Sequence, residues 1–420
     1  MFEFDVCIVG TGRVGVPLGL SLMATGATVT GLDRDPALRE VINSGRMPFQ
    51  EPGYDELIAS RRFQVHGTPD IVAKARALII TVGTPLHNHI ETDLSQVRAV
   101  LESVRPHLRA GQLICLRSTV APGTTTYVSR WLARYAGLEL GRDLRLAFCP
   151  ERIVEGKAFE ELRTLPQIIG TQDPASAREA SELFGRLTND LLHTDFVTAE
   201  LVKLFNNITR YVHFALANHL ALVSDTLGAN IFEIQHLTNY KYPRQGIASP
   251  GFTAGTCLRK DFGMINEWTP YPDLLLSAWK MNEYMPMFLV QHLKQRAPIF
   301  ERRVAVLGYT FKANSDDVRD SLVPKLLRYI ERELPAEIRV SDRHLANPIV
   351  DSAFGTAQNW KEHEAVEKAD LVFLATNHDG YRDVLLELSR RRPLAWIADL
   401  WNVGGIGKVF YQAGELTEER

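Results

Sequence analysis

Short apolar runs alternate with amphipathic stretches along the first part of the chain. The apolar runs lie at residues 5–10, 28–33, 77–83, 112–118 and 144–150. The stretches between them, such as VPLGLSLMATG and LSQVRAVLESVRPHL, keep their apolar residues at helical spacing. Because strands that alternate with helices form βαβ units, this pattern predicts a parallel, doubly wound sheet.

The pattern changes from Thr198 onward. TAELVKLFNNITRYVHFALANHLALVSDTLGANIFEI keeps helical spacing without a proline for about 30 residues, which is a helix of about 45 Å at 1.5 Å per residue. A helix of this length is expected to bridge two domains or to supply a subunit interface. The following YPRQGIASPGFTAGT (242–256) is rich in Pro and Gly, so we expect an irregular segment around Cys257.

A second alternating region begins near Arg302. Its apolar runs lie at residues 302–308, 337–342, 370–376 and 394–400. The sequence therefore predicts a second βαβ domain, and the whole chain is expected to be α/β with a helical middle.

Composition and charge narrow the function classes. The 420 residues are 45% hydrophobic and 23% charged with a formal net charge of −3, so the surface as a whole is not expected to bind nucleic acid or an anionic membrane. The N-terminal MFEFDVCIVG enters a strand without a basic signal region, and no apolar run reaches the roughly 18–20 residues that cross a bilayer. We expect a cytoplasmic protein.

The chain has four cysteines, and only Cys257 has charged residues among its near neighbours in the sequence. Cys7, Cys115 and Cys149 lie in apolar runs and are expected to pack in the core. The cysteines form no CxxC pair and no zinc-like spacing, so no metal is expected. A disulfide through Cys257 is not expected in a reducing cytoplasm, which leaves packing or catalysis for the cysteine of AGTCLRKDFG (254–263).

The loop GTGRVG predicts a dinucleotide site. Gly10, Gly12 and Gly15 follow a predicted strand and open a predicted helix, the arrangement that brings a pyrophosphate to a helix N-terminus. Asp33 ends the next predicted strand, where a carboxylate accepts from both ribose hydroxyls and repels a 2′-phosphate. We therefore expect NAD, although Arg34 is of the type that accommodates the phosphate of NADP.

Other polar residues have two interpretations. Lys203 and Asn207 share one face of the long helix, where the lysine is either an acid–base group or a surface side chain that snorkels. Ser118 and Thr119, like Glu151 and Glu155, follow predicted strands, which is consistent with ligand contacts or with turn chemistry.

Taken together, the motifs resemble those of the UDP-glucose/GDP-mannose dehydrogenase family, the nucleotide-sugar 6-dehydrogenases. The resemblance covers nearly the whole chain, and its motifs occur in the family's order: GTGRVGVPLGLSLMATGATVTGLD, VGTP, STVAPGTT, PERIVEG, AELVKLFNN, PGFTAGTCLRKD and GYTFKANSDDVRDS. It implies two Rossmann-like doubly wound domains joined by a long central helix. The implied domains are NAD-binding (1–195), central and dimer-forming (196–295) and UDP-sugar-binding (296–420), in a homodimer or higher homo-oligomer.

The resemblance also implies a reaction, the four-electron oxidation of the C6 alcohol of a UDP-sugar to a uronate with two NAD. Cys257 matches the nucleophile that forms a thiohemiacetal and then a thioester. Lys203 and Asp261 match residues that handle protons, Asn207 an oxyanion-site residue, and Thr119 and Glu151 groups that position water, with Glu151 as the base for thioester hydrolysis. A positive charge at Lys260 would favour the Cys257 thiolate.

Binding roles follow from the same resemblance. The implied cofactor contacts are Gly10, Thr11, Gly12, Arg13, Val14, Gly15, Asp33, Val82, Gly83, Thr84, Pro85, Ser118, Thr119, Val120, Glu155, Lys260 and Arg319. The implied substrate contacts are Glu151, Arg152, Ile153, Val154, Glu155, Lys203, Asn207, Arg244, Pro250, Gly251, Phe252, Thr253, Ala254 and Lys312, with Arg244 lent by the other subunit. From the residues alone, Lys312 and Arg319 fit a solvated charged loop equally well.

Several alternatives stay open. CPER (149–152) is similar to enzymes that act on UDP-N-acetylhexosamines, whereas the Lys260–Asp261 pair is similar to the glucose and mannose branch, so GDP-mannose is a further candidate substrate. A two-electron hydroxyacid dehydrogenase of the 6-phosphogluconate type also uses a lysine and an asparagine on a long helix. A third possibility is a catalytically inactive scaffold that senses NAD and keeps the fold.

Overall fold

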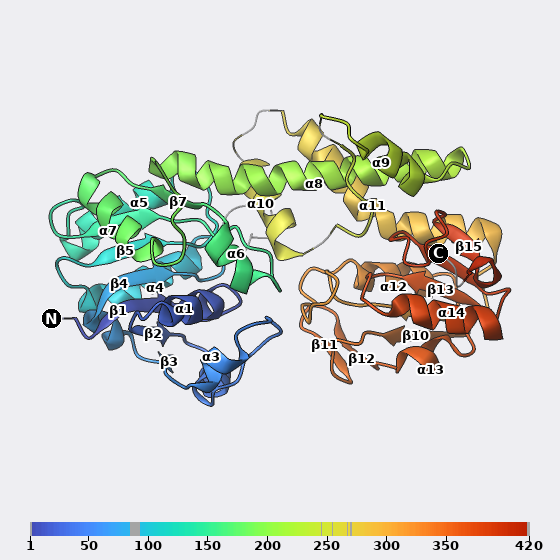
Figure 1. The fold of residues 1–420 in the computed structure, drawn as a ribbon, viewed down its shortest axis with the longest axis horizontal. Helices are drawn as coiled ribbons and strands as arrows, with labels where there is room; N and C mark the ends of the chain where they lie inside the picture. Colours follow the sequence, from blue (N-terminus) through green and yellow to red (C-terminus); the bar gives the residue numbers. More distant parts are fainter. Residues whose placement is uncertain are drawn as a thin grey trace. The chain divides into compact units, whose positions relative to one another are not determined.

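Alternating helices and strands build both halves of the computed structural model (Figure 1), which describes residues 2–84, 93–244, 246–253, 255–266, 268 and 271–417. For residues 256–259 and 266 it describes the backbone alone. The chain divides into two compact units, unit 1 (1–207 and 260–269) and unit 2 (208–259 and 270–420).

Unit 1 contains an eight-stranded sheet within the described residues, with strand order β3-β2-β1-β4-β5-β6-β7-β8. All neighbouring strands are parallel except β6 and β7, which pair antiparallel. The strands are β1 (Phe4–Val9), β2 (Val29–Leu32), β3 (Gln64–His66), β4 (Ala75–Ile80), β5 (Leu113–Leu116), β6 (Arg145–Phe148), β7 (Gln167–Gly170) and β8 (Leu191–Thr194).

Helices pack on both faces of this sheet because successive side chains of a strand point to opposite sides. On β1, Val6 and Ile8 belong to one apolar cluster and Cys7 and Val9 to another, and each cluster includes buried helical residues. The helices of unit 1 are α1 (Gly15–Ala24), α2 (Pro36–Asn43), α3 (Asp55–Ala59), η1 (Pro69–Lys74), α4 (Ser95–Val104), η2 (Arg105–His107), α5 (Thr124–Trp131), η3 (Leu132–Ala136), α6 (Ala158–Thr164) and α7 (Pro174–Phe184).

The expected long helix is present as α8 (Phe196–Thr226), drawn in green in Figure 1. It contributes residues to both units, and α10 (Thr256–Asn266) does the same. The predicted irregular segment is present in the described residues between Tyr240 and Gly255, but it ends where α10 begins, so Cys257 lies in the first turn of a helix and not in that segment. Leu258, Phe262 and Ile265 follow the i, i+4, i+7 spacing of a helix, a signal that the preceding prolines and glycines obscured.

Unit 2 contains a second doubly wound sheet, with strand order β10-β9-β13-β14-β15. Its strands are β9 (Arg303–Leu307), β10 (Glu337–Ser341), β13 (Leu371–Leu374), β14 (Trp396–Asp399) and the antiparallel β15 (Phe410–Gln412), and β11 (Ile349–Asp351) and β12 (Gly355–Ala357) form a hairpin. The helices are α9 (Ile231–Asn239), α11 (Asp273–Arg296), α12 (Val323–Glu331), α13 (Glu362–Val366), α14 (Tyr381–Arg391) and η4 (Ala413–Glu415). The predicted fold class is confirmed.

Candidate active site

The glycine loop between β1 and α1 shows three different reasons for glycine. Gly10 has a φ of +95°, a conformation that residues with a side chain rarely adopt. A Cβ on Gly15 would lie 2.1 Å from the Gly10 carbonyl oxygen, so α1 approaches the strand end too closely for any side chain. A Cβ on Gly12 would meet no atom within 4 Å, so the backbone there is open to a ligand. These features fit a dinucleotide pyrophosphate at the N-terminus of α1.

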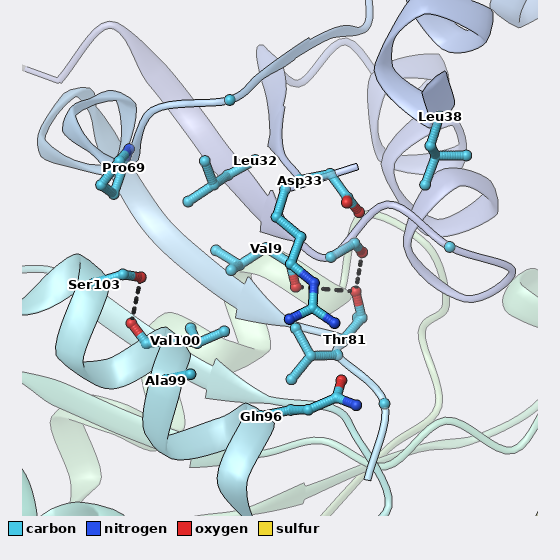
Figure 2. Close-up of a pocket in the computed structure, with 16 residues that line it drawn as sticks. Val9, Leu32, Asp33, Leu38, Pro69, Thr81, Gln96, Ala99, Val100 and Ser103 are labelled. Atoms are coloured by element: carbon cyan, nitrogen blue, oxygen red, sulfur yellow. Dashed lines mark hydrogen bonds between the residues drawn. The ribbon is translucent and has the colours of Figure 1, made fainter. Parts of the chain in front are cut away.

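Beside this loop lies a cavity of about 430 Å³ with a carboxylate at its edge. Asp33 Oδ2 accepts hydrogen bonds from Thr11 N (2.7 Å) and Thr11 Oγ1 (3.1 Å), and Asp33 Oδ1 accepts from Asp35 N (3.0 Å). Figure 2 shows Asp33 with the apolar lining residues Val9, Leu32, Leu38, Pro69, Ala99 and Val100. An apolar slot with one fixed carboxylate suits an adenosine whose ribose hydroxyls donate to Asp33. Arg34 also lines the cavity.

The carboxyl ends of β4 and β5 are linked to α10 through hydroxyl groups. Lys260 Nζ donates to Thr84 Oγ1 (3.0 Å), and the Thr84 hydroxyl donates to the Thr119 carbonyl oxygen (2.5 Å). Ser118 Oγ donates to the Val82 carbonyl oxygen (2.7 Å). The structure thus joins Lys260 to the predicted cofactor loops, while Pro85 lies outside the described residues.

A buried carboxylate forms the centre of the predicted catalytic group. Asp261 is 0% exposed, and its Oδ2 accepts a hydrogen bond from Asn207 Nδ2 (2.6 Å). Among the described residues, Asp261 Oδ1 has no hydrogen-bond partner. Burial raises the pKa of Asp261, against the opposing charges of Lys260 and Lys203 and the hydrogen bond from Asn207. Such a carboxylate is suited to accepting a proton, since its neutral form is favoured by the surroundings.

Position 257 lies one helical turn before Asp261 on α10. The Cys257 side chain and Ala254 lie outside what the structure describes. Gly255, with a φ of +92°, immediately precedes the helix, and a Cβ there would lie 2.7 Å from the Phe311 ring. The chain can therefore enter α10 only with glycine at this point.

Glu151 is held more firmly than the sequence suggested. Arg117 Nε and Nη2 donate to Glu151 Oε2 (2.9 and 2.6 Å), while Arg152 N and Ile153 N donate to Oε1 (2.7 and 3.0 Å). The Arg152 guanidinium donates to the Pro166 carbonyl. Glu155, in the same loop, lies 3.9 Å from the Arg13 guanidinium.

Sequence reasoning missed three buried charges that shape these loops. Arg117 directly follows the apolar run LICL. A charged residue next to such a run was the available signal for a buried charge. Glu51 accepts from Gly156 N (2.8 Å) and Ala158 N (2.9 Å), and Glu200 accepts from Gly123 N and Thr125 N (2.7 Å each). No local sequence pattern predicts that Glu51 and Glu200 are buried, because their hydrogen-bond partners lie far away in the sequence.

Unit 2 holds the other predicted contact residues. Pro250, Gly251, Phe252 and Thr253 are buried, and Gly251 N donates to Asn218 Oδ1 (2.9 Å) on α8. A Cβ on Gly251 would lie 2.2 Å from the Trp401 ring, so the loop packs tightly there.

The remaining predicted contacts of unit 2 are basic. Arg319 is exposed and its guanidinium donates to Asp317 (2.6 and 2.9 Å), whereas Lys312 is half-buried. Arg244 is exposed, with its guanidinium 5.4 Å from the centre of the Tyr242 ring.

The chain matches three family models in order. They are described as the NAD binding domain (residues 4–188), the central domain (197–284) and the UDP binding domain (305–404) of the UDP-glucose/GDP-mannose dehydrogenase family. Among the described residues, no helix is both long and apolar enough to cross a membrane.

Three relatives are similar over almost the full length. A UDP-N-acetyl-D-mannosamine dehydrogenase of Methanocaldococcus jannaschii is 31% identical over 90% of this chain and 86% of its own. An NDP-N-acetyl-D-galactosaminuronic acid dehydrogenase of Ralstonia nicotianae is 29% identical over 94% and 96%. The solved structure of a UDP-D-ManNAc dehydrogenase from Pyrococcus horikoshii is 30% identical with a TM-score of 0.84, covering 92% of each chain.

Proposed function

This chain belongs to the UDP-glucose/GDP-mannose dehydrogenase family and is an NAD-dependent nucleotide-sugar 6-dehydrogenase, and on this premise we propose that it oxidises a UDP-N-acetylhexosamine to the uronate. The observation that carries the proposal is the buried Asp261–Asn207 pair, which lies in the NAD-binding unit one turn beyond position 257. A scaffold that only senses NAD needs no buried carboxylate of raised pKa. The N-acetylated sugar is supported by the three relatives above and by the CPER sequence.

The proposed reaction has two oxidations and one hydrolysis. Bound NAD, held by the glycine loop and Asp33, supplies a hydride acceptor at each oxidation. In the first oxidation the C6 hydroxyl would lose its proton to a nearby base and C6 would lose a hydride to that acceptor, and the Cys257 sulfur would then add to the resulting C6 aldehyde to give a thiohemiacetal. After the second hydride loss, C6 is a thioester of Cys257, and water releases the uronate and restores the thiol.

The roles of the other side chains follow from their surroundings. Asp261 accepts protons because its neutral form is favoured by burial. Lys203 and the Asn207 amide stabilise negative charge on the oxygen at C6. Lys260, through its bond to Thr84, ties α10 to the loops that hold the cofactor.

The test counts NADH per sugar over a substrate panel. UDP-ManNAc, UDP-GlcNAc, UDP-GalNAc, UDP-glucose, UDP-galactose and GDP-mannose are each followed by NADH absorbance. We expect two NADH per sugar and the highest kcat/KM with a UDP-N-acetylhexosamine. One NADH per sugar would instead support the two-electron hydroxyacid dehydrogenase, and a best rate with UDP-glucose or GDP-mannose would reject the proposed sugar.

A matched variant tests the nucleophile. In Cys257→Ser the hydroxyl is a far weaker nucleophile than a thiolate, so we expect kcat for the complete oxidation to fall by about 10³-fold or more. Cys115→Ser, a buried cysteine in the core of unit 1, is the control and is expected to keep two NADH per sugar. A fully active Cys257→Ser enzyme would contradict the covalent mechanism.

We also propose a homodimer formed through the central helices. Within unit 2, Leu216 and Val223 of α8, Leu227 beyond its end and Leu237 of α9 are exposed. Exposed apolar side chains on neighbouring helices support an interface between subunits. A cytoplasmic location, a role in making uronic-acid polysaccharides, and the domain limits 1–195, 196–295 and 296–420 stay predictions from the sequence.

A further inference from the structure

A buried aspartate and a buried histidine lie at the carboxyl end of the sheet in unit 2, and neither belongs to the family motifs quoted above. Asp342 directly follows β10, and His378 lies between β13 and α14. The strands β10 and β13 flank β9 on its two sides, so the strand order reverses at β9, and open α/β sheets bind their ligands beyond the strand ends at such a point. Both side chains are 0% exposed, and His378 Nε2 lies 3.0 Å from Asp342 Oδ2. The pair therefore lies beside a favoured ligand position but is itself closed to solvent.

The two side chains hold the turn that follows β9. Asp342 Oδ2 accepts hydrogen bonds from Tyr309 N (2.7 Å) and Thr310 N (3.1 Å). His378 Nδ1 accepts a hydrogen bond from Asn314 N (2.9 Å), and its Nε2 lies 3.2 Å from Thr310 Oγ1. Three backbone N–H groups of one turn thus depend on acceptors that come from other parts of the sheet. Loss of either side chain would leave some of these donors without a partner, so the turn would take another conformation.

Packing and charge fix the pair in this arrangement. Burial acts to raise the pKa of Asp342, but its hydrogen bonds to His378 and to backbone N–H groups outweigh burial and leave the pKa lower than its usual value. The carboxylate is therefore ionised at neutral pH, which strengthens the hydrogen bonds that it accepts from the turn. The His378 ring packs against the rings of His344 and Tyr381, whose centres are 4.7 and 5.3 Å away. This packing fixes the direction in which Nδ1 points.

The same loop contacts the chain just before α10. A Cβ on Gly255 would lie 2.7 Å from the Phe311 ring, and Gly255 N donates to the Asp320 carbonyl oxygen (3.2 Å). Phe311 N also donates to the Asp317 carbonyl oxygen (3.1 Å), which ties the two sides of the loop after β9 together. Gly255 precedes Cys257 by two positions, and both belong to unit 2. The backbone at the entry to α10 is therefore held by the loop that the buried pair anchors.

We propose that Asp342 and His378 are positioning residues for the sugar nucleotide and for the nucleophile. They hold the turn that carries Lys312, an implied contact of the sugar nucleotide, and Phe311, which packs against the residue before α10. Neither side chain touches a reacting atom, and both act through the backbone of the turn. The inference rests on the proposed dehydrogenase function.

The first experiment compares two replacements of His378. Leu fills a similar volume without an acceptor, whereas the amide oxygen of Asn can accept from Asn314 N in place of Nδ1. For His378→Leu we expect KM for the preferred UDP-sugar to rise about tenfold or more, while KM for NAD stays within about twofold because the glycine loop belongs to unit 1. For His378→Asn we expect a smaller rise in the same KM, because the hydrogen bond to the turn is kept.

A second measurement follows the nucleophile directly. The enzyme is treated with iodoacetamide without substrate, and the alkylation rate of Cys257 is read by mass spectrometry of its peptide. In His378→Leu this rate should differ from that of the unmodified enzyme by about threefold or more, because the reactivity of a cysteine depends on its surroundings and the start of α10 is displaced. A role confined to stability would lower the melting temperature and leave the alkylation rate of the folded enzyme unchanged.

Two further variants complete the comparison. Asp342→Asn keeps the shape of the side chain but has one acceptor oxygen in place of two, so KM for the UDP-sugar should rise as in His378→Leu. The double variant should be less impaired than the product of the two single effects, because both side chains act through one turn.

His292→Ala is the matched control. His292 also pairs with an aspartate of unit 2, with Nδ1 2.9 Å from Asp225 Oδ2, but it lies on α11. This variant should keep KM for the UDP-sugar and the alkylation rate of Cys257 within about twofold of the unmodified values.

Circular dichroism checks that each variant is folded, and if His378→Leu does not fold, Asp342→Asn decides by the same two measurements. The proposal is overturned if the folded variants keep the KM and the alkylation rate of the unmodified enzyme, or if His378→Asn and His378→Leu raise KM equally. One NADH per sugar in the unmodified enzyme would instead reject the four-electron function, so the two failures are distinguishable.

Discussion

Asp261 has an unusual position for an ionisable side chain, because it is fully buried and one of its oxygens has no partner among the described residues. Burial disfavours the charged form, and the nearby charges of Lys260 and Lys203 only partly compensate. An acid whose pKa is raised by folding adds stability below its unfolded pKa of about 3.9, and this contribution is lost as pH rises through the folded pKa. Above its folded pKa, the ionised carboxylate is therefore held at a cost in stability.

The variant Asp261→Asn distinguishes the effect of Asp261 on protein stability from its role in catalysis. The amide is neutral at every pH, so the melting temperature of the variant relative to the unmodified enzyme should rise as the pH increases from the unfolded pKa of about 3.9 through the raised folded pKa of Asp261. Above that folded pKa, where the carboxylate can act as a base, kcat of the variant should be about 10²–10⁴-fold lower, the usual contribution of a general base. Differential scanning fluorimetry and initial rates measure the two effects, and Asp351→Asn, a buried aspartate of unit 2, is the control for loss of a buried charge. A melting difference that falls with pH would contradict the raised pKa.

Single residues differ in how far the sequence predicts them. Lys203, Asn207 and Asp261 were predicted because helical spacing and family motifs place them together, and the structure brings Asn207 and Asp261 into contact. The Arg117–Glu151 pair was not predicted, because its members are 34 positions apart and meet only when β5 and β6 pair. Tertiary contacts of this kind leave no periodic signal in the sequence.

At the scale of elements, the turn between β1 and α1 was predictable for a physical reason. Each glycine of GTGRVG is required for a different reason. Gly10 has a positive φ, Gly12 leaves open space for a ligand, and Gly15 lies too close to the Gly10 carbonyl oxygen for a side chain. The strands predicted from apolar runs are confirmed. The short strands β3, β7, β8, β11, β12 and β15 were missed, because three or four residues are too few to show a period. The helix at Cys257 was missed because prolines and glycines precede it.

The pair Gly12→Ala and Gly15→Ala tests this turn. A methyl group at position 15 would overlap the Gly10 carbonyl, so we expect a loss of about 1–3 kcal/mol in unfolding free energy and a weaker NAD site. A methyl group at position 12 meets no protein atom, so the unfolding free energy should stay within about 0.5 kcal/mol while the NAD dissociation constant rises about tenfold or more. Urea unfolding and NAD titration give both numbers. Tight NAD binding by a folded Gly12→Ala protein would exclude this loop as the pyrophosphate site.

At the scale of the whole molecule, α8 has one face inside unit 2 and another in solvent. Tyr211, Ala215 and Asn218 are buried at i, i+4, i+7 spacing, and Leu216 and Val223 are exposed, seven positions apart on another face. A monomer gains nothing from two large apolar side chains in water along a helix of this length, whereas a second copy would bury them. The exposed Arg244 is implied by the family resemblance to reach the site of the other subunit.

The double variant Leu216→Asp, Val223→Asp tests both the proposed interface on α8 and the proposed role of Arg244 in the site of the other subunit. Two charges on each subunit would be buried without partners in the proposed interface, so the variant should elute as a monomer of 47.2 kDa and the unmodified protein as a dimer. If Arg244 acts across the interface, the monomer should show the raised KM for the sugar nucleotide that Arg244→Ala shows in the dimer, while NAD binding is unchanged. Leu394→Asp, at an isolated residue that is 77% exposed, is the control and should stay dimeric. Light scattering coupled to size exclusion gives the mass, and a dimeric double variant would move the interface to another surface.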